Sequence, residues 1–380
     1  MAILGSIIKT TINTIDTLNF DSKTALEHQK IQLNNLLYKA KDTSFGKYYN
    51  FTSLLESKDV MKEYKKRIPI FDYNTINQKW WKQQQIQPDI TWPGHPDYFA
   101  KSSGTTGKKS KRIPITSDYI TSVRSVGTSM IKDLSKFDLP SPVFEKEIFM
   151  LSSSAKLKTH KNGFEEGEIS GINVSNFPDW YDVFYRPGKK IAAIEDWDER
   201  KEQIAIEAPN WDIGAVAGIP SWILEMLKAI IKKNNLNNIH EIWPNFTIYS
   251  SGGVAFETYR SSFEKVCGKE ITVLDTYLAS EGFFAYTARP NTMSMKLALH
   301  HNMFFEFVPF NKEGFDETGN ILKEPKVLHI HEVEENTQYA LLVTTSAGAW
   351  RYMVGDTIEF TDLKRHEIKI TGRTKFFLNV

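Results

Sequence analysis

The chain has 380 residues, more than one hydrophobic core usually supports, so we expect at least two subdomains. Its 47 basic and 46 acidic residues leave a net charge of +1, which gives no electrostatic case for a nucleic-acid or anionic-membrane partner. A single cysteine, Cys267, excludes an intrachain disulfide and a cysteine metal cluster, and fits a reducing cytoplasm.

The first third of the chain predicts helices, then extended segments. Residues up to about Tyr38 show helical spacing of leucines, and Arg67 to Tyr73 is a short extended segment interrupted by a proline. Thr116 or Ser117 is suited to cap a helix that runs through about Leu134. The charged, glycine-containing stretch 161–168 is interpreted as a solvated loop. No apolar run is long enough to span a bilayer.

The middle of the chain alternates short apolar runs with helical patterns. Predicted strands lie at 148–151, 213–218, 246–249 and 271–274, and a helix is predicted from Pro220 through Lys233. Several of these runs lead into small polar residues. In open α/β sheets, ligands bind beyond the carboxyl ends of the strands.

From about residue 303 the pattern becomes strand-rich. The predicted strands are 304–308, 327–330, 339–345, 357–360 and 368–371, with a further strand ending near Gly355. The sequence therefore predicts an α/β region followed by a β-rich subdomain.

The segment from Lys101 to Lys111 has the chemistry of a polyphosphate cradle. Its glycines free backbone N–H groups, its hydroxyls add donors, and its lysines add cations. The spacing fails both the Walker P-loop and the Rossmann pattern, which excludes an ordinary nucleotide-binding loop of either kind. By composition alone, a flexible surface loop explains the same residues equally well.

Ser102 to Gly107 resembles the phosphate loop of the adenylate-forming superfamily. The lysine four residues after Gly107, Lys111, resembles the Gretchen Hagen (GH3) family of acyl acid–amido synthetases within it. Further segments resemble that family in the same order: 43–47, 67–73, 277–282, 343–356 and 371–375.

The resemblance implies a bacterial-type homologue that lacks the C-terminal domain. The expected fold is α/β: a large N-terminal adenylation domain over 1–370, with α/β sheets flanked by helices to about 300 and a barrel-like β-rich subdomain over 301–370. Residues 371–380 correspond to the hinge, and the lid domain that follows it in the family is expected to be absent.

The implied activity is ATP-dependent conversion of a carboxylic acid to an acyl-adenylate, with release of pyrophosphate and transfer to an amine such as an amino acid. ATP and Mg²⁺ are the implied cofactors. Two alternatives stay open: thioester formation with coenzyme A, and a non-catalytic nucleotide-binding remnant. No nucleic-acid or membrane partner is expected, and the location is expected to be cytoplasmic.

The resemblance also assigns roles to residues. Lys111 and Glu281 are the expected catalytic residues, with Glu281 as the Mg²⁺ ligand; Asp356 and Arg373 are expected at the ribose. The full set of expected nucleotide-binding residues is Ser102, Ser103, Gly104, Thr105, Thr106, Gly107, Gly252, Gly253, Val254, Tyr277, Ser280, Asp356 and Arg373. The acyl pocket is less defined: it is expected to be lined by Val123, Val126 and Met130, the run 216–218 and Tyr286, unless these residues belong to the core.

Overall fold

A computed structural model describes residues 23–102, 110–177 and 179–375. The predicted N-terminal helix is α2 (Ala25–Ala40). It begins where it does because Thr24 and Glu27 form a capping box, in which the Thr24 hydroxyl accepts from the Glu27 N–H and the Glu27 carboxylate accepts from the Thr24 N–H.

The other described α-helices are α3 (Ser44–Tyr48), α4 (Phe51–Leu55), α5 (Val60–Arg67), α6 (Tyr73–Ile76), α7 (Lys82–Gln84), α8 (Ser117–Asp133), α9 (Ile169–Ser175), α10 (Lys189–Ala192), α11 (Trp197–Glu207), α12 (Pro220–Lys233) and α13 (Arg260–Val266). Two predicted starts are confirmed. Thr116 caps α8 by accepting from the Tyr119 N–H, and α12 begins at Pro220, whose missing N–H costs nothing in a first turn.

Among the described residues, eleven strands form one continuous sheet in the order β12-β13-β14-β15-β11-β10-β9-β8-β7-β3-β6. The strands are β3 (Glu147–Met150), β6 (Tyr185–Arg186), β7 (Ile213–Gly218), β8 (Ile248–Gly252), β9 (Thr272–Ala279), β10 (Gly282–Tyr286), β11 (Met295–Leu297), β12 (Met303–Pro309), β13 (Gln338–Thr345), β14 (Ala349–Asp362) and β15 (Glu367–Arg373). From β6 to β9 neighbours pair in parallel, and from β9 onward they pair antiparallel. The predicted α/β class is confirmed.

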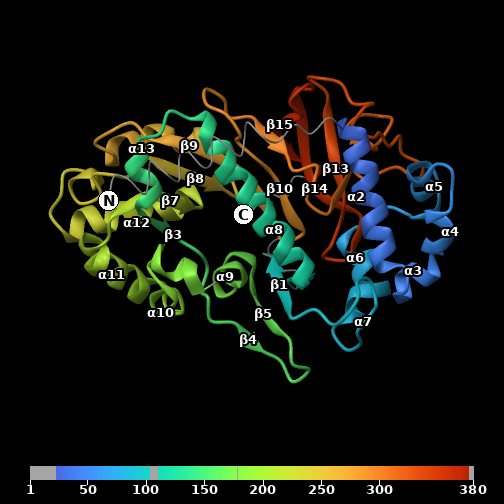
Figure 1. The fold of residues 1–380 in the computed structure, drawn as a ribbon, viewed down its shortest axis with the longest axis horizontal. Coiled ribbons are helices and arrows are strands. Elements are labelled where there is room, and N and C mark those ends of the chain that lie inside the picture. Colours follow the sequence, from blue (N-terminus) through green and yellow to red (C-terminus); the bar gives the residue numbers. More distant parts are fainter. Residues whose placement is uncertain (1–22, 103–109, 178, 376–380) are drawn as a thin grey trace.

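A second, smaller sheet has the order β2-β1-β5-β4. Its strands are β1 (Tyr98–Ser102), β2 (Lys111–Ile115), β4 (Lys158–Thr159) and β5 (Glu165–Glu168). In Figure 1 this sheet lies between the parallel strands with α11 to α13 on one side and the antiparallel strands with α2 to α7 on the other; α8 crosses the same central region.

Each half of the large sheet has its own hydrophobic core. Phe149, Val216 and Tyr249 of the parallel strands pack with α12, whereas the antiparallel half shares its core with the N-terminal helices through residues such as Leu33, Trp81 and Trp350. None of the helices in the described residues has the length and apolar character needed to cross a membrane.

Three sequence expectations were wrong. Residues 327–330 do not form a strand; Leu328 makes only an isolated bridge with Phe307. The strand expected to end near Gly355 continues as β14, because Gly355 adopts a φ of +98° and a register shift against β13 absorbs the bend. The stretch 161–168 is not simply a solvated loop, since 165–168 form β5 and Glu166 is buried.

Candidate active site

The predicted phosphate loop connects two paired strands. Ser102, the last residue of β1, is the antiparallel partner of Lys111, the first residue of β2. These two residues therefore lie side by side where the connection begins and ends. The predicted residues Ser103, Gly104, Thr105, Thr106 and Gly107 fall outside the described part of the chain.

Glu281 lies at the closed end of the hairpin formed by β9 and β10. Ala279 pairs with Gly282, so Ser280 and Glu281 form a two-residue turn. Hairpin tips are usually solvated, yet Glu281 is only 6% exposed. The Tyr119 hydroxyl of α8 donates a hydrogen bond of 3.1 Å to the Ala279 carbonyl and fixes this end of the hairpin.

Three groups from distant segments, Lys111, Tyr352 and Asp356, act on the Glu281 carboxylate. Burial raises the pKa of Glu281, while the positive charge of Lys111 and a hydrogen bond with Tyr352 of β14 act in the opposite direction. The Lys111 ammonium also lies 5.6 Å from the ring centroid of Tyr73. The structure thus brings together the two residues predicted to be catalytic, which the sequence separates widely.

Asp356 is held between two donors. The Tyr277 hydroxyl donates to Asp356 Oδ2 at 2.7 Å, and Arg373 Nε donates to Asp356 Oδ1 at 2.9 Å. Asp356 and Arg373 are direct partners across β14 and β15. Each carboxylate oxygen keeps a lone pair, so the group can still accept hydrogen bonds from two ligand hydroxyls.

Three of the predicted nucleotide-binding residues, Gly252, Gly253 and Val254, lie at the carboxyl end of β8. Gly252 pairs with Thr276, so the end of β8 lies beside the residue that precedes Tyr277. A Cβ on Gly252 would meet Thr276 Oγ1 at 2.9 Å, which explains the glycine. Gly253 adopts a φ of +83°, and Val254 is exposed. The Tyr277 ring itself is buried against Phe284, which leaves its hydroxyl as the group that meets Asp356.

The candidate acyl-pocket residues lie on facing elements. Val126 of α8 is fully buried, and the Tyr286 hydroxyl of β10 donates to Asp133 Oδ2 at 2.7 Å. His301 lies within hydrogen-bonding distance of Ser125 and Ser129, both of α8. Its pKa is lowered to about 4, chiefly by burial, so the ring is neutral at pH 7.

Sequence reasoning missed three residues of this region: Tyr73, Glu166 and Tyr352. Tyr352 lies inside a segment that carries the family resemblance, and Tyr73 ends another, so both were within reach. Nothing local singled out Glu166, because a glutamate in a charged, glycine-containing stretch is ordinarily solvated.

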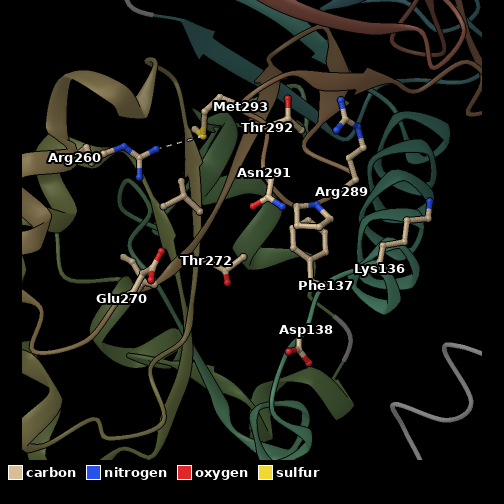
Figure 2. Close-up of a pocket in the computed structure, with 13 residues that line it drawn as sticks. Lys136, Phe137, Asp138, Arg260, Glu270, Thr272, Arg289, Asn291, Thr292 and Met293 are labelled. Atoms are coloured by element: carbon tan, nitrogen blue, oxygen red, sulfur yellow. Dashed lines mark hydrogen bonds between the residues drawn. The ribbon is translucent and has the colours of Figure 1, made fainter.

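A cavity of about 810 Å³ lies away from these residues (Figure 2). It is lined by Thr272 at the start of β9, Phe137, and the segment from Arg289 to Met293. This is the opposite end of β9 from Ala279 and Glu281. Its arginines are already engaged, Arg260 by Glu257 and Arg289 by Glu367. The convergence of Lys111, Glu281 and Asp356, and not this hollow, defines the candidate site.

The fold is that of the adenylate-forming enzymes. A solved GH3.15 acyl acid amido synthetase matches with a TM-score of 0.76 at 16% identity, covering 98% of this chain and 72% of that one. A 2-hydroxyisobutyryl-CoA ligase solved with 2-HIB-AMP and CoA matches with a TM-score of 0.60 at 13% identity, covering 93% of this chain and 70% of that one.

Within that class, the chain belongs to the GH3 family. The GH3 family N-terminal domain matches residues 14–203, and the GH3 family central domain matches residues 296–373. An indole-3-acetic acid-amido synthetase, GH3.2 of Arabidopsis thaliana, is 29% identical over 167 residues, covering 42% of this chain and 30% of the relative. A jasmonoyl–L-amino acid synthetase, GH3.5 of Oryza sativa subsp. japonica, is 27% identical over 193 residues, covering 44% and 33%. The matches thus span about a third of these relatives.

Proposed function

We propose that this protein uses ATP to convert a carboxylic acid to an acyl-adenylate, releases pyrophosphate, and transfers the acyl group to an amine such as an amino acid. One observation carries the proposal: Lys111, Glu281 and the Tyr277–Asp356–Arg373 cluster come from four separate segments, yet the charges of Lys111 and Asp356 both act on the buried Glu281 carboxylate. Membership of the GH3 family supports it.

In the first step the carboxylate oxygen of the acid attacks the α-phosphorus of ATP, and the bond from that phosphorus to the β-phosphate oxygen breaks. Negative charge builds on the phosphates, where fixed donors stabilise it. We assign this role to Lys111, Ser102 and the residues 103–107 between them. Asp356 would accept hydrogen bonds from the ribose hydroxyls, with Tyr277 and Arg373 holding its orientation.

Glu281 suits a Mg²⁺ ligand. Its carboxylate is buried without a direct ion pair among the described residues, and burial raises its pKa, so a bound dication would favour the charged form. The described residues contain no group of three or more metal-binding side chains. Mg²⁺ commonly takes one or two carboxylates together with substrate phosphates and water, and when bound it would neutralise charge on those phosphates.

Amide formation is favoured over thioester formation by the names of the relatives, which include amido synthetases and an amino acid synthetase. The attacking amine displaces AMP from the acyl carbon and loses a proton. Coenzyme A transfer and nucleotide binding without catalysis are the alternatives. The single cysteine supports a reducing location, and we propose the cytoplasm.

The test is carboxylate-dependent exchange of labelled pyrophosphate into ATP, with a panel of carboxylic acids. We expect exchange by the wild type and its loss in Glu281→Gln, whereas Glu313→Gln, at an exposed surface ion pair, keeps it. Supplying amino acids or coenzyme A then separates amide from thioester products. Tight ATP binding with no exchange for any acid would contradict the proposal and support a nucleotide-binding protein.

A further inference from the structure

A buried carboxylate, that of Glu166, contacts β1 and β2, the two strands that lead into the predicted phosphate loop. Glu166 Oε1 lies 2.8 Å from Lys101 Nζ, and Glu166 Oε2 lies 2.5 Å from Arg112 Nε. Lys101 is the residue before Ser102 on β1, and Arg112 is the residue after Lys111 on β2. One side chain therefore contacts both strands that lead into the predicted phosphate loop.

Strand geometry explains why this matters for Ser102 and Lys111. Lys101 pairs with Arg112, and Ser102 pairs with Lys111. Directly opposed residues share a face of the sheet, and successive residues point to opposite faces. Lys101 and Arg112 thus lie on one face, and Ser102 and Lys111 lie on the other. The parallel pairing of Phe99 with Glu166 places the carboxylate on the face of the first pair.

The surroundings of Glu166 keep it charged and in place. Its pKa is lowered, because hydrogen bonds and charges from Lys101 and Arg112 outweigh the effect of burial. His160 Nε2 also lies 3.2 Å from Glu166 Oε2, and the His160 ring stacks on Phe164. Breaking a buried ion pair leaves an uncompensated charge. The two ion pairs of Glu166 therefore oppose any movement of the Lys101 or Arg112 side chain away from it.

We propose that Glu166 is a positioning residue of the nucleotide site: by holding Lys101 and Arg112 on one face of the sheet, it keeps Ser102 and Lys111 on the opposite face, at the two ends of the predicted phosphate loop. The inference rests on the proposed function in that Lys111 is taken to contact the ATP phosphates. Glu166 would act through Lys101 and Arg112, and not by touching the nucleotide.

The test compares Glu166→Gln with Glu367→Gln in the full chain. Glu367 is a matched control because it is about equally buried and accepts two hydrogen bonds from Arg289, at 2.7 and 2.8 Å. It belongs to β15 and does not pair with Lys101 of β1 or Arg112 of β2. Equilibrium binding of ATP and the ATP dependence of pyrophosphate exchange are measured for both. We expect Glu166→Gln to raise the Kd and KM for ATP about tenfold with little change in kcat or in KM for the acid, and Glu367→Gln to leave all four unchanged.

Further variants keep the inference falsifiable if Glu166→Gln folds poorly. Glu166→Asp retains the charge with a shorter reach and should recover part of the ATP affinity. Lys101→Met and Arg112→Met should each weaken ATP binding, and combining either with Glu166→Gln should add little. Unchanged ATP binding in the Glu166 variants would overturn the inference. Tighter binding would also overturn it, since Lys101 and Arg112, freed from Glu166, would then bind the phosphates directly.

The readouts separate the two ideas. If the wild type binds ATP but performs no exchange, the proposed function fails, and the Kd values still decide the role of Glu166. If exchange proceeds and Glu166→Gln matches Glu367→Gln, the positioning role fails alone. Absence of ATP binding by the wild type would overturn both.

Discussion

The Tyr277 hydroxyl donates a 2.7 Å hydrogen bond to Asp356 Oδ2 and so joins β9, the last parallel strand, to β14 in the antiparallel half of the sheet. Both side chains are largely shielded from solvent, and Arg373 holds the other carboxylate oxygen. The orientation of Asp356 is therefore fixed before any ligand arrives.

Removing this hydrogen bond should weaken ATP binding. In Tyr277→Phe the ring packing against Phe284 is kept and only the donor is lost, so we expect the KM for ATP to rise about fivefold, in line with roughly 1 kcal/mol for one hydrogen bond. Tyr64→Phe is the matched control, because it deletes an equally short bond of 2.7 Å, between the Tyr64 and Thr344 hydroxyls, at a buried tyrosine with no assigned role. Steady-state exchange at varied ATP decides, and an equal rise in both variants would contradict a specific role for Tyr277.

Replacing Glu281 should separate stability from activity. Burial raises the pKa of Glu281, so the folded state favours the protonated carboxyl. Ionisation of this group lowers the stability of the fold; this loss is absent below the ordinary pKa of glutamate and complete above the raised pKa. Glu281→Gln cannot ionise, so it should melt at a higher temperature than the wild type at pH 8, with the difference shrinking toward pH 4. Exchange activity should fall roughly a hundredfold or more. A variant that is both active and no more stable would count against the assigned role.

Asp275 offers a pH test away from catalysis. Burial raises its pKa from 3.8 to about 6 and outweighs the opposing effect of hydrogen bonds from the Ser251 side chain and the Phe256 backbone. As pH rises through 4 to 7, the wild type should lose up to about 3 kcal/mol of stability through this group. Asp275→Asn should abolish that part of the loss. Urea denaturation at a series of pH values measures it, and parallel curves for the two proteins would contradict the shift.

The Arg351–Glu306 pair should be costly to break. Both residues are buried, Arg351 Nε donates to Glu306 Oε2 at 2.8 Å, and Arg351 Nη1 donates to the carbonyls of Lys65 and Ile68. Arg351→Met should destabilise the protein by about 3–5 kcal/mol, because Glu306 is left charged and buried.

Glu306→Gln in the same chain is the control for that prediction. The double variant should recover part of the lost stability in urea denaturation, since no uncompensated charge remains. If the single and double variants unfold at the same urea concentration, the cost comes from the backbone carbonyls and not from the charge.

Much of the fold follows from local signals. The periodic helices α8 and α12 begin where a capping threonine and a first-turn proline predict, and the buried strands β7 and β13 match apolar runs. The extent of β14 did not follow, because whether Gly355 ends a strand or bends it depends on the register of the neighbouring strand. Residues 327–330 do not form a strand for the same kind of reason. A strand needs a neighbouring strand to pair with, and the local sequence does not determine whether one is in reach.

For the candidate site as well, the sequence determines one part and the tertiary structure another. The amino-acid sequence by itself determined which residue types are available: a hydroxyl- and glycine-rich loop with Lys111, a glutamate after small residues, and an aspartate after a glycine. Only the tertiary structure decided that the charge of Lys111 acts on Glu281, that Tyr277 and Arg373 hold Asp356, and that Glu166 is buried against Lys101 and Arg112. Backbone propensities and hydrophobic spacing act over a few residues, whereas burial, charge pairing and the direction of a side chain are set by strands that meet from distant parts of the chain.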